Sequence, residues 1–353
     1  MISICRAVAL SFVAFLLVGH ASASDSQWVR PEKADGLLVW GRHDGIVFGL
    51  PSTPDWGVPR GLIRVGIFPA GETGPKLLNY IAVEPVVDLP TSRNYKSYSE
   101  MEPSQLDAGK QGKRLWVDTS AGPDAWRGQI TTLQREGQTI ERLSVPICVE
   151  RFNTSKAYVR LIASVDSDHP SEVRFTVFAQ DDSPPIKELT LSATMGNFER
   201  LRLIWLADQV LDSRKLAPDY KGKSFTADSN KYPVSEILRL PGGDPIVYAS
   251  SNEADPASAK TAGWPYGLPK LTQYWSVPAG DVQPDLRVRV NERYDYWRSE
   301  TPVFGGIAFE NFEVRQKYVP GQMFIFGISP KEPWDLYPGP EKLNPYPLDT
   351  PAP

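Results

Sequence analysis

Alternation of apolar and polar residues is the main pattern of the chain, and it is clearest in the stretch from Leu189 to Leu206. Its first part, residues 189–194, alternates apolar with hydroxyl-bearing residues, which predicts a strand with one buried face. Gly196 and Asn197 interrupt the run, after which residues 201–205 alternate again, so we expect a second strand that returns beside the first. A short helix starting at Phe198 is the alternative. Four residues are expected in the core, namely Leu191, Leu201, Leu203 and Trp205.

Similar patterns recur along the chain, separated by turn residues. The predicted strand pairs are 37–40 with 46–50, 61–68 with 77–83, and 158–165 with 172–179, and later strands are expected at 271–277, 286–296, 306–314 and 323–328. Residues 234–240 read as one short helix. The 33 prolines and 27 glycines are spread through the chain, which favours short elements joined by turns. These patterns predict a mainly β protein, a large antiparallel β-sandwich with few short helices.

The two ends differ from the rest of the chain. Arg6, the apolar run 7–18 and the small residues before Ser24 are typical of a secretory signal peptide, residues 1–23, cleaved between Ala23 and Ser24. We therefore expect an exported protein, periplasmic or extracellular, without a transmembrane segment in the mature chain. Residues 24–330 are interpreted as a single sandwich domain, and 331–353 as a proline-rich C-terminal tail.

Charge and composition exclude several classes of function. The net charge is −4, whereas a nucleic-acid-binding protein is expected to be basic, so no nucleic-acid partner is predicted. Signal cleavage leaves Cys148 as a single buried thiol and leaves His43 and His169, each in a turn. So few soft ligands make a zinc site improbable, and no metal or cofactor is predicted. A calcium site built from carboxylates and carbonyls stays open but is not indicated.

Glu310 is the sharpest anomaly in the strand patterns. If residues 307–314 form a regular strand, Glu310 shares a face with Phe312 and Val314, where the pattern requires an apolar residue. A carboxylate in that position is either paired or placed in a cleft. Partial burial would raise its pKa into the range used for general acid–base catalysis. A structural salt bridge to an arginine is the alternative.

Other acids are candidate partners of Glu310. Glu100 and Glu102 would face the same way in an extended segment, with α-carbons about 6–7 Å apart, and Glu84 ends an apolar strand. Pairs of carboxylates perform acid–base cleavage of glycosidic bonds. We therefore take Glu310, Glu84, Glu100 and Glu102 as candidate catalytic residues.

Candidate ligand-binding residues surround these acids in the predicted fold. Arg64 lies within a strand pattern and requires a carboxylate partner, either from the protein or from an acidic ligand. Aromatic residues are frequent in the C-terminal half and provide flat faces for sugar rings. The predicted binding residues are Arg64, Asn197, Arg200, Tyr274, Trp275 and Asn311.

Two resemblances add to this interpretation. At Pro59–Arg64, Ile81–Val86, Ser99–Glu102, Ser192–Phe198 and Ile307–Phe312 the chain resembles a family of exported bacterial proteins of uncharacterised function. More remotely, Gly305–Glu310 followed by Val319–Gln322 resembles the end of galactose-mutarotase-like super-sandwich proteins. That resemblance implies a carbohydrate ligand and a catalytic base at Glu310. The histidines of that family have no counterpart here.

Together these patterns predict an exported carbohydrate-active protein that binds or cleaves a polysaccharide or oligosaccharide by carboxylate chemistry. Hydrolase, lyase and epimerase reactions all remain open. The alternative is a non-catalytic envelope protein, a carbohydrate-binding module or a scaffold, in which the same acids and arginines form structural pairs.

Overall fold

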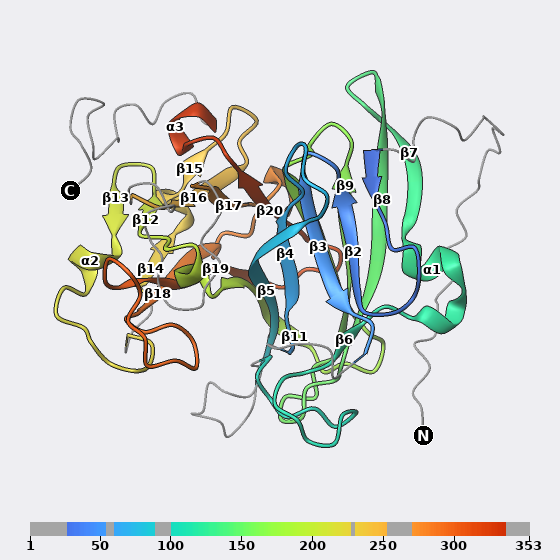
Figure 1. The fold of residues 1–353 in the computed structure, drawn as a ribbon, viewed down its shortest axis with the longest axis horizontal. Coiled ribbons are helices and arrows are strands. Elements are labelled where there is room, and N and C mark those ends of the chain that lie inside the picture. Colours follow the sequence, from blue (N-terminus) through green and yellow to red (C-terminus); the bar gives the residue numbers. More distant parts are fainter. Residues whose placement is uncertain (1–26, 54–59, 89–99, 227–229, 253–269, 337–353) are drawn as a thin grey trace.

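Two large antiparallel β-sheets form the body of the molecule (Figure 1). The structure is a computed structural model that describes residues 27–53, 60–88, 100–226, 230–252 and 270–336. Within these residues one sheet has nine strands and the other has eleven, and we name the sheets accordingly. The prediction of a mainly β sandwich with few short helices is confirmed.

Strands from both ends of the chain interleave in the nine-stranded sheet. In spatial order they are β1 (Trp28–Val29), β2 (Leu37–Arg42), β3 (Ile46–Pro51), β4 (Ile63–Ile67), β5 (Lys76–Val87), β11 (Ile186–Thr194), β19 (Ala308–Lys317), β18 (Arg287–Arg293) and β14 (Asn230–Pro233). The central strand β11 therefore lies between strands that are distant from it in the sequence.

The eleven-stranded sheet mixes middle and late strands. In spatial order they are β13 (Val210–Asp212), β12 (Leu203–Trp205), β16 (Pro245–Ser250), β17 (Thr272–Ser276), β20 (Met323–Ser329), β10 (Glu172–Ala179), β9 (Val159–Asp166), β8 (Gln138–Val149) and β6 (Leu115–Trp116), with β15 (Leu238–Arg239) beside β16 and β7 (Gln129–Arg135) beside β8. The short helices of the described residues are α1 (Pro123–Arg127), α2 (Ser213–Leu216), α3 (Pro333–Leu336) and the 3₁₀ turns η2 (Thr119–Ala121), η3 (Gly196–Phe198), η4 (Val234–Glu236) and η6 (Ala279–Asp281).

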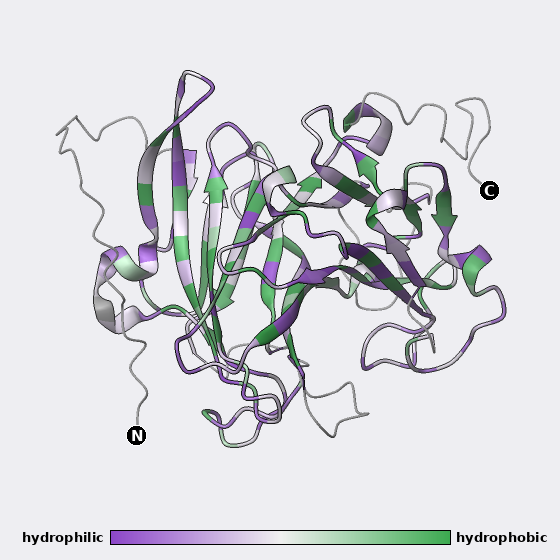
Figure 2. Cartoon of the chain, turned by 180° about the vertical axis from the view of Figure 1, so that it is seen from behind, coloured by the Kyte–Doolittle hydropathy of each residue, from purple (hydrophilic) through white to green (hydrophobic). Residues whose placement is uncertain are grey.

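The main core lies between the two sheets. Leu191 of β11 and Phe312 of β19 meet Trp275 of β17 and Phe326 of β20 in one cluster of buried apolar side chains. Figure 2 shows the corresponding change between apolar and polar residues along the strands. Burial of each large apolar side chain contributes about 1.5–3 kcal/mol, so the period-2 pattern determines which face of each strand points inward. Polar residues of the nine-stranded sheet consequently lie on its outer face.

The predicted return of the chain after β11 is wrong. After η3 the chain leaves the nine-stranded sheet, and β12 joins the eleven-stranded sheet, where it pairs with β13 and β16. Met195 and Arg200 adopt left-handed backbone conformations, with φ of 62° and 52°, and these turns direct the chain from one sheet to the other. No longer helix begins at Phe198 either. The four predicted core residues are buried.

The other predicted strands are largely confirmed, including all three predicted strand pairs. Residues 234–240 form η4 followed by β15 instead of one helix. The predicted signal peptide lies outside the described residues, as does most of the predicted tail, of which α3 is described. Among the helices of the described residues, none has the length and apolar content needed to cross a membrane.

Candidate functional site

The outer face of the nine-stranded sheet carries rows of polar side chains aligned by strand register. Ser192 of β11 lies opposite Ala82 of β5 on one side and Glu313 of β19 on the other. The neighbouring row pairs Glu84 with Thr190. We call this surface the polar face, which comprises Arg64, Tyr80, Ala82, Glu84, Thr190, Ser192, Thr194, Arg289, Asn291, Asn311 and Glu313.

Glu84 forms a carboxyl pair with Glu100 at this face. A hydrogen bond joins the two side chains, and because an ionised carboxylate only accepts hydrogen bonds, one of the two carries a proton. Burial of the carboxyl, the charge of Glu100 and the charge of Glu313 together raise the pKa of Glu84 well above its ordinary value, against the opposing effect of Arg289. Glu84 as a residue is only partly buried, but its carboxyl group is desolvated. Glu84 is therefore the protonated member of the pair.

The position of Glu100 is fixed by backbone contacts. Its carbonyl oxygen accepts a hydrogen bond from the backbone N–H of Lys113 at 2.7 Å. Gly61 lies against the same carbonyl, and a β-carbon at Gly61 would come within 2.6 Å of that oxygen. Gly61 also has a φ of +79°, which favours glycine. A tight turn before β4 thus holds the segment that presents Glu100 to Glu84.

Glu313 adds a third acid, with its own counter-charge. Its carboxylate lies 3.3 Å from a guanidinium nitrogen of Arg289 on the adjacent strand β18. Burial raises the pKa of Glu313 in spite of Arg289. Both groups belong to the row that contains Ser192. In the row beside the carboxyl pair, the residues on the β19 side, Glu313 and Arg289, are therefore charged. On the β5 side the row ends in Ala82, which is small and neutral.

Two hydroxyl groups of the polar face make no hydrogen bond within the described residues. They are Thr190 Oγ1 and Ser192 Oγ, and their residues are 0% and 3% exposed. Buried polar groups nearly always have a partner in proteins. Both hydroxyls lie on the side of β11 that carries Glu84 and Glu313.

Aromatic side chains occupy the other end of the polar face. Tyr80 and Trp297 pack against a small buried cluster that contains Ala82. The guanidinium of Arg64 lies 5.9 Å from the centroid of the Tyr80 ring. Thr194 donates a hydrogen bond of 2.6 Å to Asn311. Arg64 and Asn311, two of the predicted binding residues, therefore belong to the same face as Glu84 and Glu100.

Glu310 lies elsewhere, and its predicted place in the strand is wrong. The register of β18 and β19 shifts opposite this residue, so Phe309 pairs with Glu292 while Asn311 pairs with Asn291. Phe309 consequently joins the core with Phe312. The shift breaks the alternation on which the prediction depended.

Glu310 is instead buried, at 1% exposure. Burial raises its pKa to about 8, against the charge of Arg293 and the backbone N–H of Asn197, although neither oxygen has a well-formed hydrogen bond among the described residues. The side chain of Asn197 donates to the carbonyl of Asp295 at 3.3 Å, and Arg200 is buried with its guanidinium near the ring of Phe304. Glu310 therefore lies beside η3, where the backbone N–H of Asn197 contacts it.

The two predicted stacking residues, Tyr274 and Trp275, do not lie on the polar face. Trp275 is in the core and donates a hydrogen bond of 2.8 Å to the carbonyl of Phe312. Tyr274 lies on the outer face of the eleven-stranded sheet, where its hydroxyl donates to Glu172 at 3.3 Å. Both are strand residues of β17, whose side chains alternate between two packed faces.

Glu102 points away from Glu100, contrary to the predicted common orientation. Its carboxylate accepts a hydrogen bond of 2.6 Å from the backbone N–H of Asn153. Because residues 100–104 form turns and an isolated bridge, the strand geometry assumed for this segment does not apply. Glu102 anchors the segment to the loop after β8, and Glu100 alone faces Glu84.

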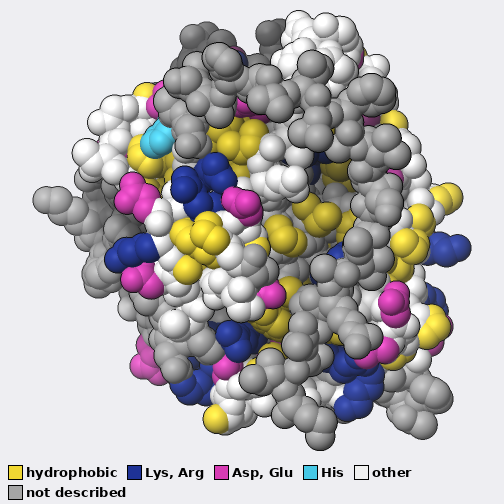
Figure 3. Space-filling view, turned by 90° about the vertical axis from the view of Figure 1, so that its right-hand side faces the viewer, with side chains coloured by type: hydrophobic (Ala, Val, Ile, Leu, Met, Phe, Trp, Pro, Cys, Tyr) yellow, Lys and Arg dark blue, Asp and Glu magenta, His cyan; other side chains and the backbone are white. Residues whose placement is uncertain are grey.

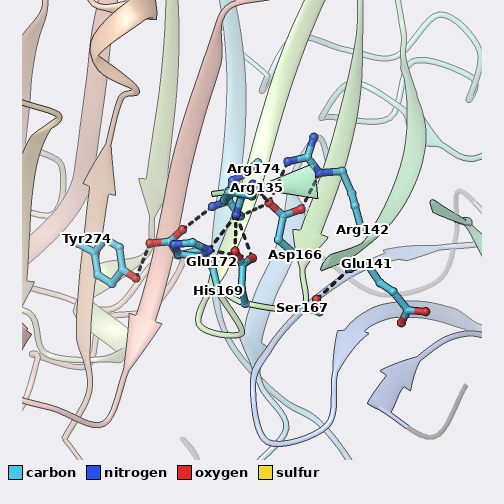
Figure 4. A network of polar contacts seen from close by, with 10 residues as sticks. Arg135, Glu141, Arg142, Asp166, Ser167, His169, Glu172, Arg174 and Tyr274 are labelled. Atoms are coloured by element: carbon cyan, nitrogen blue, oxygen red, sulfur yellow. Dashed lines mark hydrogen bonds and ion pairs between the residues drawn. The ribbon is translucent and has the colours of Figure 1, made fainter. Parts of the chain in front are cut away.

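A second polar network, on the eleven-stranded sheet, has the character of a structural ion cluster. Figure 4 shows Asp166 surrounded by Arg135, Arg142 and Arg174, with hydrogen bonds of 2.5 Å from Arg135 and Arg142 and a nitrogen of Arg174 at 3.2 Å. Although burial opposes ionisation, the hydrogen bond from Arg142 and the charge of Arg174 lower the pKa of Asp166 to about 2. The network continues to Glu172 and Tyr274. Its charges are matched within the protein.

Four central members of the polar face are not among the candidates from the sequence, namely Glu313, Arg289, Thr190 and Ser192. The hydroxyls alternate with core residues in β11, a pattern that predicts a strand with one buried face but does not by itself indicate a ligand site. Among the described residues no group of three or more potential metal ligands is arranged to hold an ion. No protein-family model and no curated protein matches the chain.

Proposed function

We propose that the polar face binds a saccharide and that Glu84 and Glu100 transfer protons on it. The observation that carries this proposal is the hydrogen-bonded Glu84–Glu100 pair, in which a desolvated acid with a raised pKa adjoins a second carboxylate. Unpartnered hydroxyls beside the pair and the rings of Tyr80 and Trp297 supply the polar and flat contacts that sugars require.

The spacing of the pair favours one reaction class over another. Hydrolytic carboxylate pairs lie about 5–9.5 Å apart because the glycosidic bond lies between them, whereas Glu84 and Glu100 are in direct hydrogen-bond contact. A pair this close suits proton transfer at one position of the sugar, as in lyase or epimerase chemistry. Glu100 accepts a proton from the substrate, and Glu84 donates one to the oxygen on which charge develops. The charge of Glu313 raises the pKa of Glu84, and the charge of Arg289 lowers it.

The experiment is an assay of the mature protein against a panel of polysaccharides and oligosaccharides, with products followed by mass spectrometry. Glu84→Gln removes the acidic proton and is expected to reduce turnover by about 10²–10⁴-fold. Glu102→Gln is the matched control, since it lies in the same segment as Glu100 but contacts Asn153, and it should retain turnover. Absence of turnover on every substrate, or full activity of Glu84→Gln, would refute the catalytic proposal.

A non-catalytic saccharide-binding protein is the second candidate. It is favoured by the low solvent exposure of the polar face beside the carboxyl pair. Thr190, Ser192 and Thr194 are each less than a tenth exposed, and Glu313 already has Arg289 as its counter-charge. In this case a saccharide that binds to the protein would be recovered unchanged, and Glu84→Gln would change its affinity without any product in either protein.

A further inference from the structure

A cleft of about 600 Å³ opens at the edge of the eleven-stranded sheet. Its size falls in the range of small-ligand sites, about 300–1,000 Å³. Its walls come from the segment that contains β6 and η2, from the loop after residue 104 and from the junction of β8 and β9. The lining includes Arg114, Trp116, Asp118, Glu150, Arg151 and Tyr158.

Residues 114–118, which include β6, present three different side chains to this cleft. Leu115 and Val117 are buried in the core, so the alternation of an extended chain turns Arg114, Trp116 and Asp118 to the other side, where all three line the cleft. β6 is the last strand of its sheet. One wall of the cleft is therefore a row of alternate residues that consists of a guanidinium, an indole and a carboxylate.

Two aromatic rings in the cleft are each accompanied by a guanidinium. Arg114 lies 5.2 Å from the ring centroid of Trp116, and Arg151 lies 4.7 Å from that of Tyr158. Trp116 and Tyr158 are both only partly buried. Each guanidinium covers part of its ring, and the partial exposure of both residues leaves other ring atoms to contact a ligand.

Most charges in the cleft are already satisfied. Glu150 accepts hydrogen bonds from the hydroxyl of Ser104 and from three backbone N–H groups, which hold its pKa below the ordinary value although burial opposes this. Arg151 is paired with Asp182.

Arg114 and Asp118 are the exceptions in the cleft. Within the described residues the Arg114 side chain has no acidic partner, and Asp118 uses one carboxylate oxygen to cap Ser120. The unsatisfied groups are thus one cation and one anion. Figure 3, which faces the end of the molecule with β7 and α1, likewise shows Lys and Arg interspersed with Asp, Glu and hydrophobic side chains.

We propose that this cleft binds a short neutral oligosaccharide. The guanidinium of Arg114 and the carboxylate of Asp118 provide donors and acceptors to sugar hydroxyls, and the rings of Trp116 and Tyr158 contact the apolar faces of the sugar rings. The balanced charge favours an uncharged ligand. None of the residues that line the cleft belongs to the polar face, so this inference goes beyond the function proposed for that face. It would hold a saccharide chain whether or not the Glu84–Glu100 pair is catalytic.

The test is a titration of the full chain with neutral hexasaccharides of gluco, galacto and manno configuration, followed by NMR of the tryptophan indole N–H groups. The signal of Trp116, assigned by its loss in Trp116→Ala, should shift with at least one hexasaccharide. By calorimetry Trp116→Ala should weaken binding about tenfold, the equivalent of about 1.4 kcal/mol. Asp118→Asn retains an oxygen to cap Ser120 and should also weaken binding.

Trp297→Ala, on the polar face, is the matched control and should leave the Trp116 shift unchanged. The proposal is overturned if no neutral hexasaccharide shifts Trp116, if only an acidic oligosaccharide such as hexagalacturonate does so, or if Trp116→Ala and Asp118→Asn bind as well as the parent chain. The readout is a binding shift at Trp116, so its failure is distinguishable from loss of turnover in Glu84→Gln.

Discussion

Glu84 and Glu100 share a hydrogen bond although one belongs to strand β5 and the other to the irregular segment beyond it. Two acids in direct contact are stable only when one of them holds a proton. The pair therefore links the chemistry of the polar face to its protonation state. Measurements of pKa and of pH-dependent stability should distinguish the Glu84–Glu100 pair from the other buried carboxyl groups.

Glu100→Gln should lower the pKa of Glu84 toward its ordinary value, because it removes a neighbouring negative charge. An acid whose pKa is raised by folding contributes stability that is lost as pH rises from its unfolded pKa to its folded pKa. Because the pKa of Glu84 is shifted less in Glu100→Gln, the free energy of unfolding of this variant should fall less than that of the parent chain as pH rises between the unfolded and folded pKa values of Glu84. Carboxyl ¹³C NMR gives the pKa of Glu84, and Glu102→Gln should leave it unchanged. An unaltered pKa in Glu100→Gln would contradict the paired geometry.

Glu310→Gln tests a buried acid outside the polar face. The pKa of Glu310 is about 8 in the fold against an ordinary value of 4.5, so its contribution to stability is constant below about pH 4.5 and declines as pH rises to about 8, by up to about 5 kcal/mol. The glutamine variant lacks this decline. Urea unfolding near pH 9 should show it about 2–4 kcal/mol more stable than the parent, and nearly equal near pH 4.5. Parallel pH profiles for the two proteins would show that Glu310 does not titrate as stated.

Asp166→Asn should destabilise the eleven-stranded sheet by about 3–5 kcal/mol, since it leaves the guanidiniums of Arg135, Arg142 and Arg174 facing each other without their central anion. In the parent chain, Asp166 has a pKa of about 2, so its stabilisation is present above about pH 4 and is lost as pH falls toward 2. Chemical denaturation measures both effects. Asp182→Asn removes the ion pair with Arg151, in which the acid is largely exposed. Its cost in free energy of unfolding should stay below about 1 kcal/mol.

Trp275 in the core and Trp297 on the polar face should contribute very differently to the free energy of unfolding. Trp275→Ala creates a core cavity and removes a hydrogen bond to Phe312, so it should cost about 3–5 kcal/mol in unfolding free energy. Trp297→Ala, at the partly buried end of the polar face, should cost about 1 kcal/mol or less. Under the proposed function it should also weaken saccharide binding in calorimetry. Equal effects on stability would mean that Trp297 is a core residue.

The strand pattern predicted the sandwich well because each strand has one strongly apolar face. The hairpin of β2 and β3, for example, needs only local alternation and an Asp44–Gly45 turn. The pattern failed where backbone irregularities intervene. One register shift moves Glu310 off the face that alternation assigns to it, and the left-handed turns at Met195 and Arg200 send β12 to the other sheet.

The candidate site was only partly visible in the sequence for a related reason. Glu84 and Glu100 could be named as candidates, because an acid that ends an apolar strand and an acid in a long polar segment both stand out. Their contact with each other, and with Glu313, depends on strand order, which local patterns do not contain. Tyr274 and Trp275 show the opposite error, since aromatic content alone does not distinguish a packed ring from an accessible one.

The position of β11 between β5 and β19 has a consequence for how the molecule is made. The acids of the polar face come from the first third of the chain and from its last strands, so a growing polypeptide cannot assemble them until residue 317 has been synthesised. Contacts this distant in sequence form slowly, and until then the edge of β11 that pairs with β19 is exposed to wrong partners. A chain truncated before β19 should therefore aggregate instead of yielding a smaller, folded version of the protein.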